Sequence, residues 1–186
     1  MLPLMVCSVL MWTLIVERLL FFVGLTGRDI SVRDALDLLD RDAARDVPGR
    51  GLRARLVGAF LRARTGRPEL DEAVVYHASL RLRPVLHRYL ALIAVLASMA
   101  PLLGLLGTVM GMVETFNVIS VFGTGNVKGL SSGISVALIT TQGGLLVAIP
   151  GLFLSGYLFR RAARQEVRLE EITSILMRYV RRGAAA

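Results

Sequence analysis

Two threonines, Thr108 and Thr141, lie inside long apolar stretches of the chain that carry no charged residue. A hydroxyl both donates and accepts hydrogen bonds, so it can orient a water molecule or solvate an ion in a narrow apolar space. A threonine in a membrane helix also commonly bonds a carbonyl of its own preceding turn, which requires no ligand. The two residues are therefore candidates either for the lining of a path or for simple packing.

Each threonine belongs to a row of small residues at helical spacing. In lipid, small residues let two helix backbones approach closely. Pro101 and Pro150 stand near these rows, and each removes a backbone donor and can bend its helix. We therefore expect close helix packing with two proline hinges. The small residues are Gly104, Gly107 and Gly111 in the first stretch, and Ala137, Gly144 and Ala148 in the second.

Composition indicates a membrane protein. The 186 residues are 54% hydrophobic and carry a formal net charge of +8. The mean hydropathy of +0.62 is high for a soluble domain. The basic residues are excluded from the apolar stretches and gather beside them, as on the cytoplasmic side of membrane proteins. No basic patch is interleaved with aromatic residues, which argues against nucleic-acid binding.

The side chains that perform covalent or metal chemistry are sparse. His77 and His87 are ten residues apart, without other ligand types at metal spacing, so surface or interface roles are expected. The single cysteine, Cys7, excludes an internal disulfide. No nucleophile arrangement or phosphate-binding loop is present in the sequence. We therefore expect no metal, no cofactor and no enzyme activity.

The chain divides into apolar and charged segments, and an apolar run of roughly 20 residues is enough to cross a bilayer. A cleaved signal peptide is the alternative for the first run, but no positive segment precedes it. The expected segments are a first transmembrane helix at 1–26, a cytoplasmic helical domain at 27–88, a second transmembrane helix at 89–114, a periplasmic link at 115–133, a third transmembrane helix at 134–159 and a cytoplasmic C-terminal helix at 160–186.

Local signals place helices in the charged segments. Ser31 followed by Asp34 predicts a helix start, because the hydroxyl can cap a free backbone N–H. The C-terminal segment repeats apolar residues at helical spacing, so it should continue the third transmembrane helix as an amphipathic extension. The helices expected within the cytoplasmic domain run from Val32 to about Asp46, from Leu52 to Arg64, and from Pro68 toward the membrane with Pro84 as a kink point.

The distribution of basic residues predicts the topology. Residues 27–88 hold 13 arginines, the tail from Arg160 holds 7, and the link between the last two apolar stretches holds only Lys128. The positive-inside rule then places the large loop and the tail in the cytoplasm and the N-terminus outside. The expected fold is an all-α membrane protein with three transmembrane helices.

Two motifs carry a resemblance to a known family. APLLGLLGTVMGMVETF (residues 100–116) and GISVALITTQGGLLVAIPGLF (residues 133–153) closely resemble the MotA/TolQ/ExbB family of inner-membrane ion-channel subunits. The short N-terminus resembles ExbB-type biopolymer transport subunits more than flagellar stators. The resemblance implies a homopentamer around two helices of an ExbD/TolR-like single-span partner. Such a complex uses the proton motive force to act on a TonB-like protein that opens outer-membrane transporters.

The resemblance also implies roles for individual residues. Thr108 and Thr141 match the family's paired threonines, which line the central path near a carboxylate of the partner. Pro101 and Pro150 match its paired prolines. Further polar residues that could support the path are Glu17, Arg18, Ser135 and Gln142.

One position departs from the family pattern. Many ExbB-type relatives carry a glutamate at the position of Val136, and this chain has no Asp, Glu, Lys, Arg or His between Lys128 and Arg160. A titrating carboxylate would then come from a partner or from Glu17. Two alternatives therefore stay open, a TolQ-like envelope-maintenance motor subunit and a non-conducting scaffold paralogue. A small receptor or solute transporter is disfavoured, because no charged site lies in the last two spans.

Overall fold

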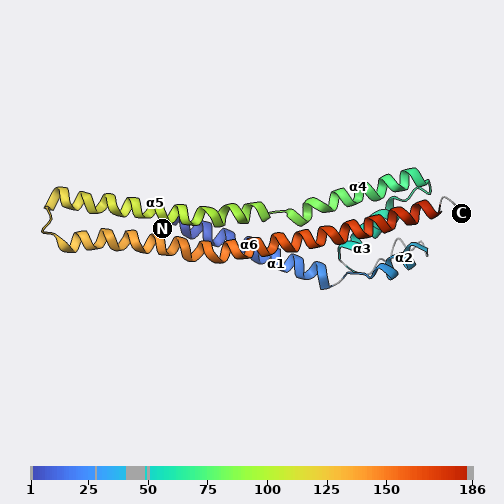
Figure 1. Ribbon diagram of the computed structural model, residues 1–186, viewed down its shortest axis with the longest axis horizontal. Coiled ribbons are helices and arrows are strands. Elements are labelled where there is room, and N and C mark those ends of the chain that lie inside the picture. Colours follow the sequence, from blue (N-terminus) through green and yellow to red (C-terminus); the bar gives the residue numbers. More distant parts are fainter. Residues whose placement is uncertain (1, 28, 41–48, 50, 184–186) are drawn as a thin grey trace. The chain divides into compact units, whose positions relative to one another are not determined.

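The computed structural model describes residues 2–27, 29–40, 49 and 51–183, and all regular secondary structure in this part of the chain is α-helix. Figure 1 shows the order of the elements along the chain. The helices are α1 (Leu2–Gly27), α2 (Val32–Asp40), α3 (Leu52–Ala63), α4 (Pro68–His87), α5 (Leu90–Phe122) and α6 (Val127–Gly183).

The helices form two compact units. The first, here called the apolar unit, contains residues 2–17 and 89–157, and so holds most of α1, all of α5 and the first part of α6. The second, called the charged unit, contains the described residues of 18–88 and 158–183. Both α1 and α6 contribute to each unit.

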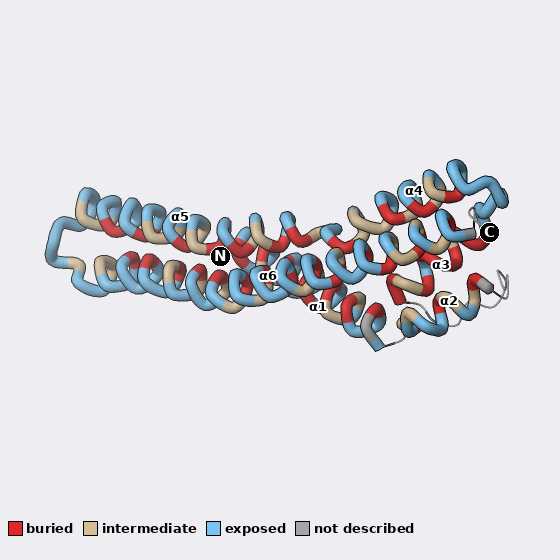
Figure 2. The backbone as a smooth tube through the Cα atoms, turned by 45° about the vertical axis from the view of Figure 1, so that its right-hand side comes forward, coloured by how far each residue is buried: buried red, intermediate tan, exposed pale blue. Residues whose placement is uncertain are grey.

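In the apolar unit, hydrophobic side chains cover the outside as well as the inside. Met11 and Ile15 of α1 and Ile93 of α5 are fully buried, whereas Leu146 and Phe153 of α6 are about three-quarters exposed. Figure 2 shows the buried positions running along the facing sides of α5 and α6. Helices that are hydrophobic all round belong in lipid. Among the described residues, three helices are long and apolar enough to cross a membrane.

The connection between α5 and α6 is shorter than the sequence analysis expected. The link was placed at residues 115–133, but α5 continues to Phe122 and α6 begins at Val127. Gly129 and Gly133 lie inside α6, where a glycine costs only about 1 kcal/mol relative to alanine. Gly133 packs against Thr115 of α5, so its missing side chain is used for close contact.

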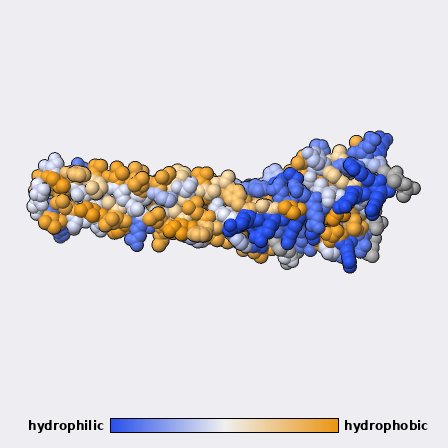
Figure 3. Space-filling model, viewed as in Figure 1, coloured by the Kyte–Doolittle hydropathy of each residue, from blue (hydrophilic) through white to orange (hydrophobic). Residues whose placement is uncertain are grey.

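The charged unit has the opposite organisation, with a core of large hydrophobic side chains. Leu56 and Phe60 of α3 are fully buried, as are Leu169 and Leu176 of α6. Figure 3 shows hydrophobic side chains over α5 and the first part of α6, and hydrophilic ones gathered over the last part of α6. This is the pattern of a domain that folds in water.

Side-chain oxygens cap two helix starts in the charged unit. The predicted start at Ser31 is confirmed, because the Asp34 N–H donates to the Ser31 hydroxyl at 3.1 Å. Asp29 accepts from the N–H groups of Arg53 and Ala54 at 3.1 and 3.4 Å, and thereby caps α3. α2 is seen to Asp40, and the remainder of the helix expected to about Asp46 lies outside the described residues.

The boundary between α4 and α5 lies at residues 88–89, beyond the proline that the sequence predicts as a kink point. Pro84 stays inside α4, which ends at His87. Tyr89 adopts a left-handed conformation with φ 63° and ψ −6°, and α5 begins directly after it. A non-glycine residue in this region costs about 1–2 kcal/mol, so the surrounding structure must impose it.

Candidate functional site

The small residues of α5 and α6 bring the two backbones into close contact within one chain. A Cβ atom added at Gly107 would stand 2.5 Å from the Cβ of Thr140, and one added at Gly144 would stand 2.8 Å from the Ala100 carbonyl oxygen. Such separations leave no room for a side chain. A Cβ at Gly111 would likewise lie 2.9 Å from the Cβ of Ala137. The row of small residues therefore packs α5 against α6 inside the subunit.

Thr108 and Thr141 lie beside this contact and are half-buried. The Thr108 hydroxyl donates to the Leu105 carbonyl at 2.6 Å, and the Thr141 hydroxyl donates to the Ala137 carbonyl at 3.5 Å. Both hydroxyls thus donate their hydrogen bond to a carbonyl of their own helix. Each hydroxyl oxygen keeps acceptor capacity, so either could still accept a bond from water.

Two other threonines, which the sequence analysis did not single out, are the buried ones. The Thr140 hydroxyl donates to the Ala137 carbonyl at 2.8 Å, and the Thr115 hydroxyl donates to the Gly111 carbonyl at 2.9 Å. Thr140 faces Gly107, and Thr115 faces Gly133. Their spacing contains the signal, because Thr140 is three residues after Ala137 and four before Gly144. Thr140 therefore fits the small-residue row as well as Thr141 does.

Two other polar candidates on α6, Ser135 and Gln142, lie on its outer side. Ser135 and Gln142 are exposed, and with Ser131 they line a shallow groove whose remaining walls are apolar. Val136 is also exposed, with 51% of its surface accessible. The groove faces away from the small-residue contact with α5. A polar row on an otherwise apolar helix surface is a candidate contact for another membrane helix or for water.

Ala148 and Pro150 lie further along the same helix. Ala148 is buried beside Leu4 and Ala100, in a cluster that joins the three helices of the apolar unit. Pro150 lies inside α6, as Pro101 lies inside α5. Both helices continue through their prolines, and a hinge role for them stays a prediction.

Arg18 is buried in the charged unit at 2% exposure. Its Nη1 donates to the Val85 carbonyl at 3.2 Å, near the C-terminal end of α4, and its guanidinium lies 5.0 Å from the centre of the Phe21 ring. The last carbonyls of a helix lack intrahelical donors, and a cation there is favoured by the helix dipole. Arg18 therefore joins the end of α4 to α1, whereas Glu17 lies in the other unit.

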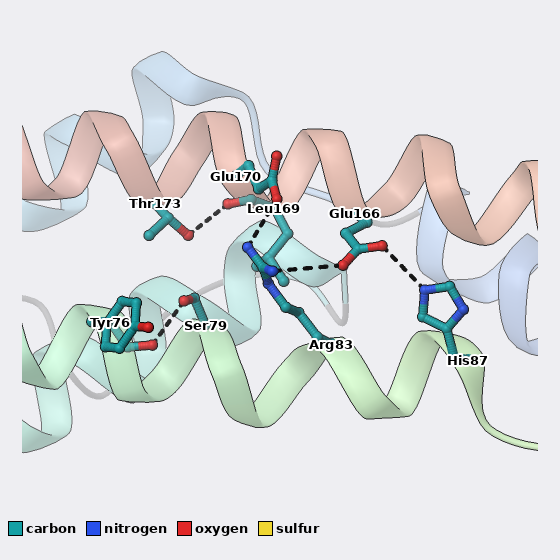
Figure 4. A network of polar contacts seen from close by, with 8 residues as sticks. All are labelled: Tyr76, Ser79, Arg83, His87, Glu166, Leu169, Glu170 and Thr173. Atoms are coloured by element: carbon teal, nitrogen blue, oxygen red, sulfur yellow. Dashed lines mark hydrogen bonds and ion pairs between the residues drawn. The ribbon is translucent and has the colours of Figure 1, made fainter.

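Ion pairs join α4 to the last part of α6 (Figure 4). Arg83 contacts Glu170 at 2.8 Å and Glu166 at 3.8 Å, while His87 contacts Glu166 at 3.1 Å. His87 is therefore an interface residue of these two helices. His77 lines a groove between α3 and α4 whose other walls are mainly apolar.

A further pair joins the other end of α4 to α6. Nε of Arg181 lies 2.7 Å from Oε1 of Glu72. The hydrogen bond from Arg181 lowers the pKa of the Glu72 carboxyl below its usual value, and the same bond raises the pKa of Arg181. Both groups are exposed, so solvent screens this attraction.

Residues 44–171 match the MotA/TolQ/ExbB proton channel family, and this match contains α3, α4, α5 and most of α6. The chain belongs to this family. It is a multi-pass membrane protein of ExbB type, and the family match covers the small-residue contact and the four threonines described above.

Similarity to ExbB proteins extends across several bacteria. The chain is 38% identical to the biopolymer transport protein ExbB of Aquifex aeolicus, over 52% of this chain and 66% of that protein. It is 35% identical to a putative ExbB-like protein 1 of Synechocystis, over 83% of this chain and 64% of that protein. It is 31% identical to the biopolymer transport protein exbB1 of Vibrio cholerae, over 90% of this chain and 78% of that protein. The chain thus spans just under two thirds of the first two relatives.

Proposed function

We propose that this chain is the wall-forming subunit of an ExbB-type complex that uses an ion gradient across the bacterial inner membrane to energise transport. Its partner is a single-span membrane protein of the ExbD/TolR type, which supplies the titrating carboxylate. A TonB-like protein would carry the resulting force to transporters of the outer membrane. In this proposal the chain performs no covalent catalysis.

The observation that most supports this proposal is that polar side chains lie within the two long apolar helices α5 and α6. Ser135 and Gln142 are exposed on α6, and Thr108 and Thr141 are half-exposed beside the α5–α6 contact. Polar groups are costly against lipid and usually face a cavity or another helix. Because residues 129–159 contain no Asp, Glu, Lys, Arg or His, these hydroxyl and amide groups would solvate an ion while a partner changes its charge.

Copies of the chain would assemble as a pentamer around two partner helices. The small-residue row is occupied by the contact between α5 and α6, so contacts between copies would use the exposed large side chains instead. Native mass measurement of the complex purified from its own membranes should give five copies of this chain with two of the partner. A monomer, or a dimer without the partner, would contradict this assembly.

The orientation is proposed from charge asymmetry. The 13 arginines of residues 27–88 would lie in the cytoplasm, and the turn at Gly123–Asn126 would lie in the periplasm. In a Cys7→Ser background, a membrane-impermeant thiol reagent added outside should label Asn126→Cys and spare Arg67→Cys. The reverse pattern would overturn the orientation.

Conservative substitutions test the polar path. Valine has the shape of threonine without its hydroxyl, so Thr108→Val and Thr141→Val should reduce ion flux in reconstituted vesicles while leaving assembly intact. Thr140→Val is the matched control, because the Thr140 side chain is buried against α5 whereas Thr108 and Thr141 are half-exposed. Val136→Ala should also have little effect. Full flux in both Thr→Val variants would exclude a path lined by these hydroxyls.

The apolar Val136 favours a second candidate, a scaffold that assembles with the same partners but conducts no ions. Both candidates predict the same native mass. Only the flux of the wild-type complex separates them, and absence of flux with a complete set of subunits would support the scaffold.

A further inference from the structure

A row of exposed arginines follows the last apolar stretch of the chain. Arg160, Arg164 and Arg168 are four residues apart on α6, so they lie on neighbouring parts of one helix face, and all three are exposed. The first of them comes directly after Phe159, where the apolar stretch ends. Figure 3 shows hydrophilic side chains gathered over this part of α6.

The acidic residues of the same segment are engaged elsewhere. Glu166 and Glu170 contact Arg83 of α4, and Glu171 contacts Arg53 of α3 at 3.4 Å. Figure 4 shows the first two carboxylates directed toward α4. Within the described residues, Arg160, Arg164 and Arg168 have no ion pair with a carboxylate. The segment therefore has an acidic side that is docked and a basic side that is not.

An apolar side chain lies within the basic row. Val167 is 66% exposed and stands between Arg164 and Arg168 in sequence, and Ala163 beside it is exposed as well. The exposed valine gives this face both apolar and basic character. It suits a surface where charged headgroups and hydrocarbon meet.

We propose that the row Arg160–Arg164–Arg168, with Val167, binds the phosphate headgroups of anionic phospholipids at the cytoplasmic surface of the membrane. The proposal rests on the proposed function for the orientation of α6. A guanidinium presents a planar pair of donors that matches two phosphate oxygens, which an ammonium group cannot do. Basic residues directly cytoplasmic of a membrane helix attract anionic lipid by the same electrostatics.

Helix geometry predicts how much each of the three arginines contributes to lipid binding. Residues four apart are separated by about 6 Å along a helix axis. Each headgroup layer is about 5–8 Å thick. Arg160 would therefore lie within the layer, Arg164 at its outer edge, and Arg168 beyond it, reaching back with its long side chain. Arg160 should contribute most and Arg168 least.

The test uses the full-length complex in a neutral detergent, titrated with short-chain phosphatidylglycerol or phosphatidylcholine and read by native mass measurement. Each arginine near an anionic surface contributes roughly a fivefold gain in affinity. Arg160→Gln should therefore weaken phosphatidylglycerol binding about fivefold, and the triple Arg→Gln variant by more than that, up to about 100-fold if the three contributed equally. Phosphatidylcholine binding should not change.

A second triple variant controls for net charge. Arg62, Arg178 and Arg182 are exposed arginines away from the row, and changing all three to glutamine removes the same charge. This control should keep wild-type affinity for phosphatidylglycerol. An equal loss in both triple variants would overturn a localised site. Equal competition by glycerol phosphate, which has no acyl chains, would exclude lipid as the occupant.

Two further measurements test the proposal if the triple variant at Arg160, Arg164 and Arg168 fails to fold. The triple Arg→Lys variant keeps the charge and should bind more weakly than wild type but more tightly than the glutamine variant. Wild-type binding of phosphatidylglycerol should fall as salt rises, because salt screens exposed charges. Salt-independent binding would overturn the proposal. Since none of these measurements uses ion flux, a non-conducting complex would refute the proposed function and leave the lipid site standing.

Discussion

The two units of this protein expose opposite kinds of side chain. In the apolar unit small residues such as Gly107 and Gly144 form the α5–α6 contact, and the outside carries large hydrophobic side chains such as Phe153. In the charged unit the inside holds Phe60 and Leu169, and arginines and carboxylates cover the outside. A single helix, α6, contributes to both arrangements.

This difference indicates which interaction stabilises each unit. In water, burying large apolar side chains is itself favourable, at roughly 25 cal/mol per Å². In lipid that driving force is absent, so helices associate through close backbone packing and large residues can face outward. Substitutions that add volume should therefore damage the apolar unit, and substitutions that remove volume should damage the charged one.

The largest effect should come from Gly144→Leu. The added Cβ would stand 2.8 Å from a backbone oxygen of α5, which cannot move aside by changing rotamer. We expect loss of a folded, monodisperse protein in size-exclusion chromatography, and Gly107→Leu should act in the same way. Gly156→Leu is the control on the same helix, because open space surrounds that glycine. Normal elution of Gly144→Leu would refute the close α5–α6 packing.

Phe60→Ala should be the next most damaging change. Its side chain is fully buried in the charged unit, and such truncations cost about 3–5 kcal/mol of unfolding free energy. Phe153→Ala removes the same atoms from the exposed side of the apolar unit and should cost within about 0.5 kcal/mol. Chemical denaturation in detergent measures both values. Equal losses of unfolding free energy in Phe60→Ala and Phe153→Ala would contradict the difference between the two units.

A smaller effect is expected at the cap of α3. Asp29→Ala removes the acceptor for the first N–H groups of that helix, which should cost about 1–2 kcal/mol. Asp29→Asn keeps one oxygen and should recover part of the loss. Gly51→Ala should mimic Asp29→Ala, because an added Cβ collides with the Asp29 side chain. If Asp29→Ala unfolds at the wild-type denaturant concentration, the cap does not stabilise the charged unit.

The smallest effect should come from the exposed pair of Glu72 and Arg181. Because the folded-state pKa of Glu72 is lowered, its contribution is present above the unfolded-state pKa and is lost as pH falls through the folded-state pKa. Glu72→Gln should remove that part of the acid sensitivity and little else. Comparing the thermal midpoints of the two proteins from neutral to acidic pH checks this. If the thermal midpoints of the wild type and of Glu72→Gln fall equally as the pH is lowered, the pair makes no contribution to stability.

Much of this fold can be predicted from the sequence, because helix starts and apolar faces leave local signals. The starts at Leu52, Pro68 and Leu90 follow from the glycine, proline and charge pattern and agree with the structure. The cap of α3 leaves no such signal. Asp29 is 24 residues away from Arg53 in the chain, and only tertiary folding brings them together.

The candidate site was harder to predict, because neighbouring residues on a helix differ by about 100° in direction. Thr140 and Thr141 both satisfy a three-or-four spacing to the small residues, and only the structure distinguishes the buried one from the half-exposed one. The family resemblance selected Thr108 and Thr141 as lining residues. Their role as a path stays a prediction that the flux measurements test.

The close contact of α5 with α6 also limits how this protein can change length during evolution. Inserting one residue between Gly104 and Gly111 would rotate everything on one side of it by about 100° and carry part of the small-residue row away from α6. Only insertions near seven or eleven residues would restore the face, because they complete two or three whole turns. The turn at Gly123–Asn126 is free of this requirement, so insertions there should accumulate while α5 keeps a fixed register.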